Sequence, residues 1–283
     1  MNRFTWNLLV LLTVAGTAAS LAAVRSTEAF KSTKPEAIQL FNGKDLTNFY
    51  TWLVNFHYED PDKVFTVVDA IDGAPAIRVS GQHYGAFITK EEYSDYHLVT
   101  EFRWGLATWG GRNDKTKDSG ILLHCQGPDG NTGKDFNGPW MHSIECQIIQ
   151  GGTGDFILVG GFDKDGNQRK AKLTATVRKE AQATIYDPKG EPATFDGGRI
   201  DWFGRDPEWK DVIGFRGRND VESPDGQWTR LEVICDGDKI TNIVNGKVVN
   251  VGTGASPSRG KIIFQSEGAE IFFRKIELTP LKK

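Results

Sequence analysis

Short strand-like segments succeed one another along this chain, and turn-forming dipeptides rather than helical repeats separate them. Residues 64–69 alternate between apolar and polar side chains, and residues 76–79 answer them across Asp72-Gly73, which predicts a hairpin. Further strands are predicted at residues 38–41, 86–89, 97–104, 120–125, 143–149, 261–265 and 270–278. Strands at this spacing, without intervening helix periods, predict an all-β sandwich or barrel.

The pattern is clearest near the C-terminus. A meander is predicted at residues 229–235, 239–244 and 247–251. Its two turns contain Asp236-Gly237 and Asn245-Gly246, dipeptides that favour tight hairpins. These three segments therefore form one continuous antiparallel unit in the predicted sandwich.

One long segment departs from this pattern. Residues 151–227 are polar and rich in Gly, Arg and Asp, and we interpret them as extended loops with a few short strands. Long ordered loops on a β-scaffold usually shape a site. The only weak helix candidates in the chain are residues 90–93 and a piece at residues 179–183.

The N-terminus has the features of a signal peptide. Arg3 gives a positive start, and an apolar stretch then runs over residues 6–23 and ends in small residues. We expect a signal peptide at residues 1–22, a linker at 23–37 and the sandwich domain at 38–283, which places the protein in the periplasm or outside the cell. The alternative is an uncleaved membrane anchor, because the stretch approaches the length of a short span.

Charge limits the partners of the mature protein. The formal net charge is −3, and no basic run or stripe is present, which argues against nucleic acid as a partner. No later segment is long and apolar enough to cross a membrane, so no membrane contact is expected after signal cleavage. A neutral or mildly polar ligand fits this balance.

The chain has three cysteines, Cys125, Cys146 and Cys235, so they cannot all pair. Cys125 and Cys146 could form one bridge in an oxidising compartment. Buried free thiols that behave as small apolar side chains are the alternative. Their spacing does not indicate a zinc site.

Polar residues share one face of several predicted strands. Glu101 and Arg103 alternate with aromatic residues, Glu145 and Gln147 alternate with apolar ones, and His124 points away from its two neighbours. A solvent-exposed sheet face is one explanation. The alternative is a shared concave groove, since carboxylates, an arginine, an amide and an imidazole are unusual on an ordinary wet face.

Carboxylates beside aromatic rings suit sugar chemistry. One carboxyl can act as acid and another as base or nucleophile. Trp140 could stack on a pyranose ring, although core packing would explain it equally well. His142 stands just before the strand of Glu145 and could reach into the groove, but a lone histidine is more often structural.

Several segments in order resemble the 3-keto-disaccharide hydrolase family, also called DUF1080. The resemblance covers about residues 38–281. It rests on Leu40-Phe41-Asn42-Gly43-Lys44-Asp45-Leu46, Glu101-Phe102-Arg103, Asp118-Ser119-Gly120-Ile121, Glu145-Cys146-Gln147-Ile148, Pro224-Asp225-Gly226-Gln227-Trp228, Asn245-Gly246-Lys247 and Phe272-Phe273-Arg274-Lys275-Ile276. It implies a concanavalin-like jelly-roll sandwich with long loops on the concave side.

The resemblance also implies the reaction, which is cleavage of glycosides already oxidised at C3. The C3 ketone acidifies the C2 hydrogen, a base removes it, and the group on C1 leaves by elimination. Such a site needs a base, an acid for the leaving oxygen and a cationic group at the enolate oxygen. A divalent metal could take that last role, but the sequence shows no decisive ligand set, and no cofactor is otherwise implied.

These requirements assign roles by resemblance. Glu145 is the expected base or acid, Glu101 its partner, and Arg103 or His124 the enolate stabiliser. The expected substrate contacts are Gln147, Asp118, His142, Trp140, Gln265 and Glu267. The chain departs from the family at two places: Glu267 replaces the family's usual histidine in Gln265-Ser266-Glu267-Gly268, and His124 stands where the family often has arginine.

Two other classes of function stay open. A lectin-like module would hold an oligosaccharide or glycoside without cleaving it. A structural or adhesion domain would use sandwich edges and loops and would have no pocket that contains Glu101, Arg103 and Glu145. The enzyme and the lectin-like module would both bind a sugar, and they would differ in whether they cleave it.

Overall fold

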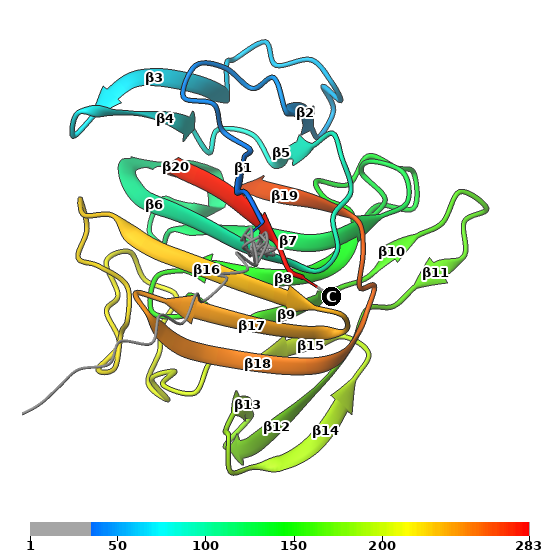
Figure 1. Ribbon diagram of the computed structural model, residues 1–283. Helices are drawn as coiled ribbons and strands as arrows, with labels where there is room; N and C mark the ends of the chain where they lie inside the picture. Colours follow the sequence, from blue (N-terminus) through cyan, green and yellow to red (C-terminus); the bar gives the residue numbers. More distant parts are fainter. Residues whose placement is uncertain (1–34, 283) are drawn as a thin grey trace, which may run out of the picture. The chain divides into compact units, whose positions relative to one another are not determined.

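The computed structural model describes residues 35–282, and almost all of its regular structure is β-strand. The strands form two antiparallel sheets packed face to face, with strands β16 to β18 in front of β7 to β9 in Figure 1. The prediction of an all-β jelly-roll sandwich is confirmed. The predicted signal peptide and nearly all of the predicted linker lie outside the described residues, so both stay predictions. No helix within residues 35–282 could span a membrane.

The smaller sheet has seven strands. In spatial order they are β15 (Gly198–Ile200), β9 (Phe156–Val159), β8 (His142–Ile149), β7 (Asp118–Gln126), β19 (Lys261–Ser266), β5 (Gly85–Thr89) and β2 (Phe49–Leu53). Four of them, β7, β8, β19 and β5, match strands predicted from the sequence, whereas β2, β9 and β15 were not predicted.

The larger sheet has eleven strands. Its main path is β13 (Ala183–Tyr186), β12 (Lys172–Glu180), β18 (Lys247–Ser256), β17 (Lys239–Val244), β16 (Thr229–Asp236), β6 (Tyr96–Thr108), β20 (Ala269–Pro280), β4 (Ala74–Val79) and β3 (Phe65–Ile71). The strand β1 (Ile38–Gln39) pairs with β20, and β14 (Glu191–Phe195) pairs with β12. The separate hairpin of β10 (Gly161–Phe162) and β11 (Gln168–Arg169) projects from one side (Figure 1).

Two predicted hairpin turns are confirmed in detail. Strands β3 and β4 pair across Asp72-Gly73, and β17 and β18 pair across Asn245-Gly246. All four turn residues have positive φ, from 48° to 81°. Two-residue turns of this kind match the right-handed twist of the flanking strands, and Asn, Asp and Gly tolerate that backbone best.

The long polar segment contains more strand than the sequence predicted. Strand β12 alone is nine residues long, and it joins the larger sheet through β18. The helix candidate at residues 179–183 is wrong, because these residues make the β12–β13 hairpin, and residues 90–93 form no helix either. Residues 202–228 do form the expected extended loop.

The apolar core lies between the two sheets. Its largest members include Phe87 and Phe264, whose rings stack at 4.7 Å, and Phe102 and Phe273 from the larger sheet. A second apolar cluster, which contains Trp52 and Leu122, lies on the outer face of the smaller sheet. There the loop of residues 127–141 folds over the sheet, and Trp52 donates a hydrogen bond to the Gly138 carbonyl at 3.0 Å. This outer face is therefore covered, and it can bury polar groups.

The three cysteines are buried free thiols. Cys125 packs in the outer cluster of the smaller sheet, whereas Cys146 packs in the core between the sheets. Because these two side chains lie on opposite faces of one sheet, the bridge between them that the sequence left open does not form.

Candidate functional site

A set of polar side chains is buried on the outer face of the smaller sheet. Glu145 and Gln147 project from β8, Asp118 from the start of β7, and Gln265 from β19. Their neighbours along the strands, such as Cys146, point into the core. Since alternate residues of a strand face opposite sides, the polar set shares the covered outer face. We call these four residues, together with Glu267, the polar cluster.

The carboxyl group of Glu145 and the amide group of Gln265 both have atoms without hydrogen-bond partners among the described residues. Glu145 is 3% exposed, and its Oε1 has no hydrogen-bond partner among residues 35–282. The amide Nε2 and Oε1 of buried Gln265 also lack partners within that range. Buried polar atoms are normally paired, so three unpaired atoms at one place indicate a position prepared for a ligand.

Gly120 leaves room for the ends of these two side chains, which pack directly against its backbone. A Cβ atom at Gly120 would lie 2.2 Å from Glu145 Oε1 and 2.3 Å from Gln265 Oε1. Any side chain here would push both groups aside. The glycine of β7 therefore forms the floor on which the unpaired carboxyl and amide meet.

Asp118 is held from two sides. Arg112, from the 3₁₀ turn η1 (Gly110–Arg112), forms an ion pair with its Oδ2, and Gln147 donates a 2.8 Å hydrogen bond to its Oδ1. Arg112 also donates to Asp211 of the 202–228 loop at 3.1 Å. This chain of contacts ties the long loop and the turn to the floor of the polar cluster.

Burial raises the pKa values of the three carboxyls, and the charges of neighbouring carboxylates add to it. The pKa of Glu145 lies well above its ordinary value, chiefly through burial and then through the charge of Asp118. The pKa of Glu267 is raised in the same way, by burial, Asp118 and Glu145. Burial raises the pKa of Asp118 to about 6, against the opposing charge of Arg112. Arg199 of β15 opposes the shift at all three carboxyls.

Glu145 opens on one side into a pocket of about 480 Å³. Trp140 and Pro139 of the covering loop form one wall, and Ile157 and Val159 of β9 form the other. We call this the apolar pocket. Of the residues expected to contact a sugar, the structure therefore brings Asp118, Gln147, Gln265, Glu267 and Trp140 to Glu145.

Glu101 and Arg103 do not join Glu145, and the expected shared groove is wrong for them. Both project from the outer face of β6 in the larger sheet, with the whole core between them and β8. Glu101 pairs with Arg274 at 2.7 Å, and Arg103 pairs with Asp72 at 2.7 Å. These are ordinary surface ion pairs.

His124 is also displaced from the site, because β7 contains a bulge. The register between β7 and β8 shifts after Leu123, and His124 has a φ of 57°. The extra residue turns the imidazole towards the core, where it packs edge-on against Tyr96 at 5.7 Å. Burial lowers its pKa to about 4, so it is neutral there. Its expected place on the polar face is wrong.

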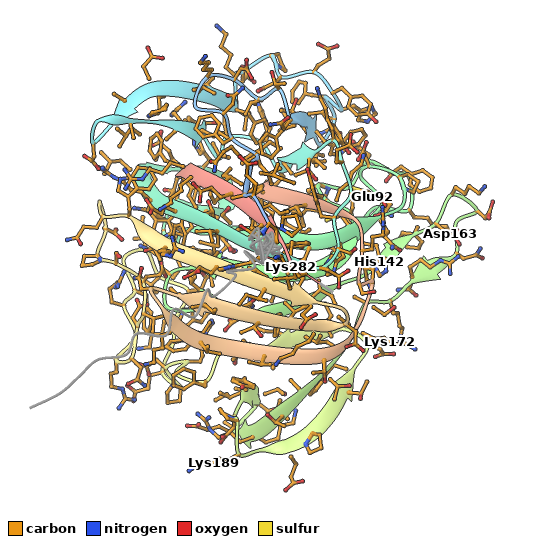
Figure 2. The ribbon with its side chains drawn as sticks, in the orientation of Figure 1. Glu92, His142, Asp163, Lys172, Lys189 and Lys282 are labelled. Carbon is orange, nitrogen blue, oxygen red and sulfur yellow. The ribbon has the colours of Figure 1, made fainter. Side chains whose placement is uncertain are left out.

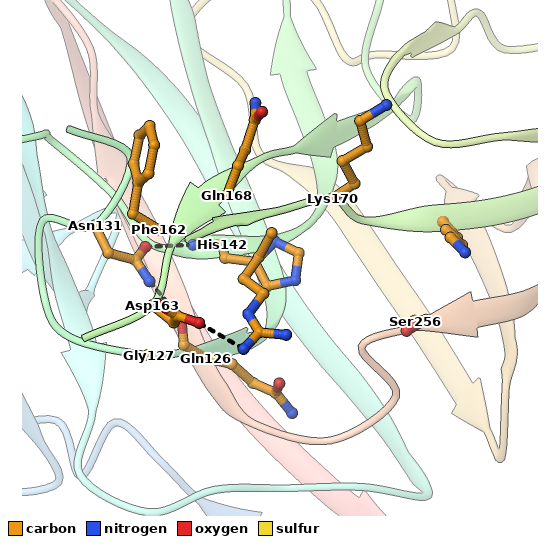
Figure 3. A pocket seen from close by; sticks show the side chains of 11 residues that line it. Gln126, Gly127, Asn131, His142, Phe162, Asp163, Gln168, Lys170 and Ser256 are labelled. Carbon is orange, nitrogen blue, oxygen red and sulfur yellow. Dashed lines mark hydrogen bonds and ion pairs between the residues drawn. The ribbon is translucent and has the colours of Figure 1, made fainter. Parts of the chain in front are cut away.

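His142 lies at another pocket. Its Nδ1 donates to the Val159 carbonyl at 3.0 Å, and its backbone amide donates to Asn131. It lines a pocket of about 590 Å³ together with Asp163 and Lys172. Figure 2 shows where His142 lies in the molecule, and Figure 3 shows it in this pocket near Asn131, Phe162 and Gln168. His142 and Glu145 are three residues apart on β8, so their side chains point to opposite faces of the strand and His142 does not join the polar cluster.

The sequence missed three residues that complete the site. Arg112 and Arg199 supply its positive charge, and Tyr84 lies close enough for the charge of Glu267 to raise its pKa after burial. Arg112 follows two glycines in a connection, and Arg199 lies in the segment interpreted as loop. A basic residue just before the Asp118 strand was the only local signal.

The structure also bears on whether these residues could bind a divalent metal. Within residues 35–282 no three His, Cys, Asp or Glu side chains are grouped so that they could hold a metal ion. The residues present do not form a ligand set for the divalent metal that the sequence left open.

Comparison with known proteins gives a family and distant likenesses in structure. A family model described as a 3-keto-alpha-glucoside-1,2-lyase-like domain matches residues 36–279. Two solved Parabacteroides distasonis proteins, both provisionally named glycosyl hydrolases, share 17% and 18% identity over 87% of this chain. The alignments cover 94% and 100% of those chains, with TM-scores of 0.48 and 0.46. A carbohydrate-binding module from Bacillus subtilis shares 12% identity over 82% of this chain and 96% of its own, with a TM-score of 0.40. No curated protein matches the sequence.

Proposed function

The chain belongs to the 3-keto-alpha-glucoside-1,2-lyase-like family, a carbohydrate-related family, and from this membership we propose that it cleaves 3-keto-glycosides by elimination at Glu145. One observation carries the proposal: the buried carboxyl of Glu145 has an unpaired oxygen and faces a pocket walled by a tryptophan. Perturbed carboxyls in a pocket are typical of catalytic sites.

The proposed reaction needs one base, which removes a proton, and one acid, which supplies a proton to the leaving group. The base takes the proton from C2, and the C–H electrons form an enolate with the C3 ketone. The enolate collapses to re-form the ketone, a double bond forms between C1 and C2, and the C1–O bond breaks. The acid gives its proton to the departing oxygen, so the products are an unsaturated keto sugar and an alcohol. Water adds to the double bond afterwards.

Glu145 and Glu267 fit the acid and base roles as a pair. Glu145 is buried and Glu267 is half-buried. Both have a raised pKa, and the charge of Glu145 raises the pKa of Glu267 further. Two interacting carboxyls lose their protons in two separated steps, which leaves one ionised and one protonated over the range between. We assign base and acid to this pair. Asp118 is held by Arg112 and Gln147, and we assign it the role of a positioning residue beside this pair.

Arg199 is the group we assign to the enolate oxygen. Its guanidinium makes only a 3.7 Å ion pair with Asp155 among residues 35–282, whereas Arg112 is committed to Asp118 and Asp211. A cation in a covered site stabilises a developing oxyanion more than it would in water. The unpaired amide of Gln265 can donate to a sugar hydroxyl and accept from another.

The direct test is turnover of a 3-keto-glucoside beside the same glucoside that has not been oxidised. We expect release of the alcohol from the keto compound only, since without the ketone the C2 proton is not acidic enough to be removed. Cleavage of both compounds would indicate an ordinary glycosidase. Tight binding of the sugar without cleavage of either would indicate a carbohydrate-binding module and overturn the proposal.

A second expected result concerns Gly120. Gly120→Ala should lower kcat/KM by about 10²-fold, because small misplacements of reacting groups have effects of that size. The added methyl group displaces Glu145 and Gln265 directly. The free energy of unfolding should decrease by about 1–3 kcal/mol, the usual cost of adding a methyl group to a well-packed site. Steady-state kinetics and urea denaturation measure both, and full activity in a folded variant would contradict the role of this floor.

A further inference from the structure

The two sides of Glu145 differ in chemistry. On the side of β7 and β19 lie Asp118 and Gln265 of the polar cluster. On the side of β9 lies the apolar pocket, in which Ile157 and Val159 face Trp140 and Pro139. Strand β8, which carries Glu145, separates the two sides because β7 and β9 are its two neighbours in the sheet.

The apolar pocket offers few polar partners to a ligand. Apart from Glu145, the polar side-chain groups among its lining residues are the Thr132 hydroxyl and the Trp140 indole N–H, and the indole already donates to the Gly85 carbonyl at 3.2 Å. The Thr132 hydroxyl already donates to the Trp140 carbonyl at 3.1 Å and accepts from the Trp140 amide at 3.3 Å. Arg199 does not line this pocket. Its guanidinium lies near Asp155, which directly precedes β9, whereas Val159 is the last residue of that strand.

The polar cluster suits the keto sugar, and the apolar pocket suits what leaves it. The ring hydroxyls need donors and acceptors, and the polar cluster has three unpaired atoms for them. A second sugar in the apolar pocket would lose the hydration of several hydroxyl groups without gaining hydrogen bonds, which is unfavourable. An aromatic group meets no such penalty and can stack on Trp140.

Resting on the proposed function, we infer that the group leaving from C1 binds in the apolar pocket and is an apolar, aromatic-sized alcohol rather than a second sugar. The size is sufficient. An apolar cavity of about 150 Å³ holds benzene, and this pocket measures about 480 Å³. Val159 is then a residue that determines specificity for the leaving group.

The test uses two 3-keto-glucosides that differ only in the leaving alcohol, 2-phenylethanol or 2-(2-hydroxyethoxy)ethanol. Both are primary alcohols of similar acidity, so the chemistry of departure is matched. We expect kcat/KM to be higher for the phenylethyl compound by about tenfold or more, as for a well-filled apolar pocket. Val159→Thr keeps the shape, adds a hydroxyl and should reduce this preference by about fivefold. Val248→Thr, at an exposed site on β18, should leave it unchanged.

Binding of the corresponding unoxidised glucosides, measured by calorimetry, gives a second and independent reading. Equal affinity and equal kcat/KM for the two alcohols would overturn the inference, as would a preference that Val159→Thr leaves intact. If neither keto compound is cleaved but the phenylethyl glucoside binds more tightly and Val159→Thr weakens it, the proposed reaction fails and the apolar pocket stands.

Discussion

Glu145→Gln is expected to abolish cleavage of a 3-keto-glucoside, with a loss in kcat of about 10²–10⁴-fold, the usual contribution of a general acid or base. The amide has the shape of the carboxyl but neither accepts nor donates the proton that the elimination needs. Sugar affinity should stay close to that of the wild type, because Gln265 and Trp140 are untouched. Initial rates together with calorimetric binding separate the two effects.

The same substitution should make the protein more stable. The pKa of Glu145 is raised in the folded state, so the folded protein holds a proton that the unfolded chain has lost. Stability then falls as pH rises from the unfolded value of about 4.3 towards the raised folded value, by about 1.4 kcal/mol for each pH unit in that window. Glu145→Gln removes this loss, so its advantage in urea denaturation should be small at pH 4 and grow above it.

Glu101→Gln is the matched control for this experiment. It makes the same chemical change on the outer face of the other sheet, where Glu101 pairs with Arg274. We expect normal turnover and a change in the free energy of unfolding of at most about 1 kcal/mol, as for a half-buried ion pair at the surface. Full activity of Glu145→Gln, or equal losses in the two variants, would remove Glu145 from the mechanism.

The contrast between these two glutamates shows what a sequence pattern can predict. Both alternate with apolar residues, and that pattern correctly places each on an outer face. The pattern does not say which sheet a strand joins, because β6 and β8 are placed by pairing with distant strands. Asp72-Gly73 and Asn245-Gly246 were predictable because the backbone of a tight turn depends only on adjacent residues.

Other misses have equally specific causes. The bulge after Leu123 adds one residue to β7 and reverses the direction of His124, and a single sequence gives no warning of it. Arg112 reaches Asp118 from a short 3₁₀ turn, and the link to Asp211 joins residues 99 positions apart. Asp118, Glu145, Gln147 and Gln265 were identifiable from their strands. The cations were not, because Arg112 lies in a connection and Arg199 lies in the three-residue strand β15, within a segment interpreted as loop.

Arg112→Met is expected to destabilise the protein by about 3–5 kcal/mol, which is typical when one partner of a buried ion pair is removed. Asp118 is 2% exposed, and among residues 35–282 it would keep the hydrogen bond from Gln147 and the more distant charge of Arg199. Arg112 lowers the pKa of Asp118 in the folded protein, so its loss raises that pKa further above the unfolded value of about 3.9. Asp118 is protonated in both folded proteins below its wild-type pKa of about 6, so the charge-dependent deficit should be small below pH 6 and increase as pH rises above it.

The double variant Arg112→Met/Asp118→Asn tests this cause directly. Without the buried charge, most of the deficit should disappear and its pH dependence with it, whereas loss of the contact with Asp211 would remain. Arg103→Met is the control, since its partner Asp72 is well exposed on the other sheet, and a change of at most about 1 kcal/mol is expected there. A deficit that is independent of pH and that Asp118→Asn does not relieve would show that Arg112 acts through packing rather than through the charge of Asp118, and the assignment of Asp118 as an ionised positioning residue would then fail.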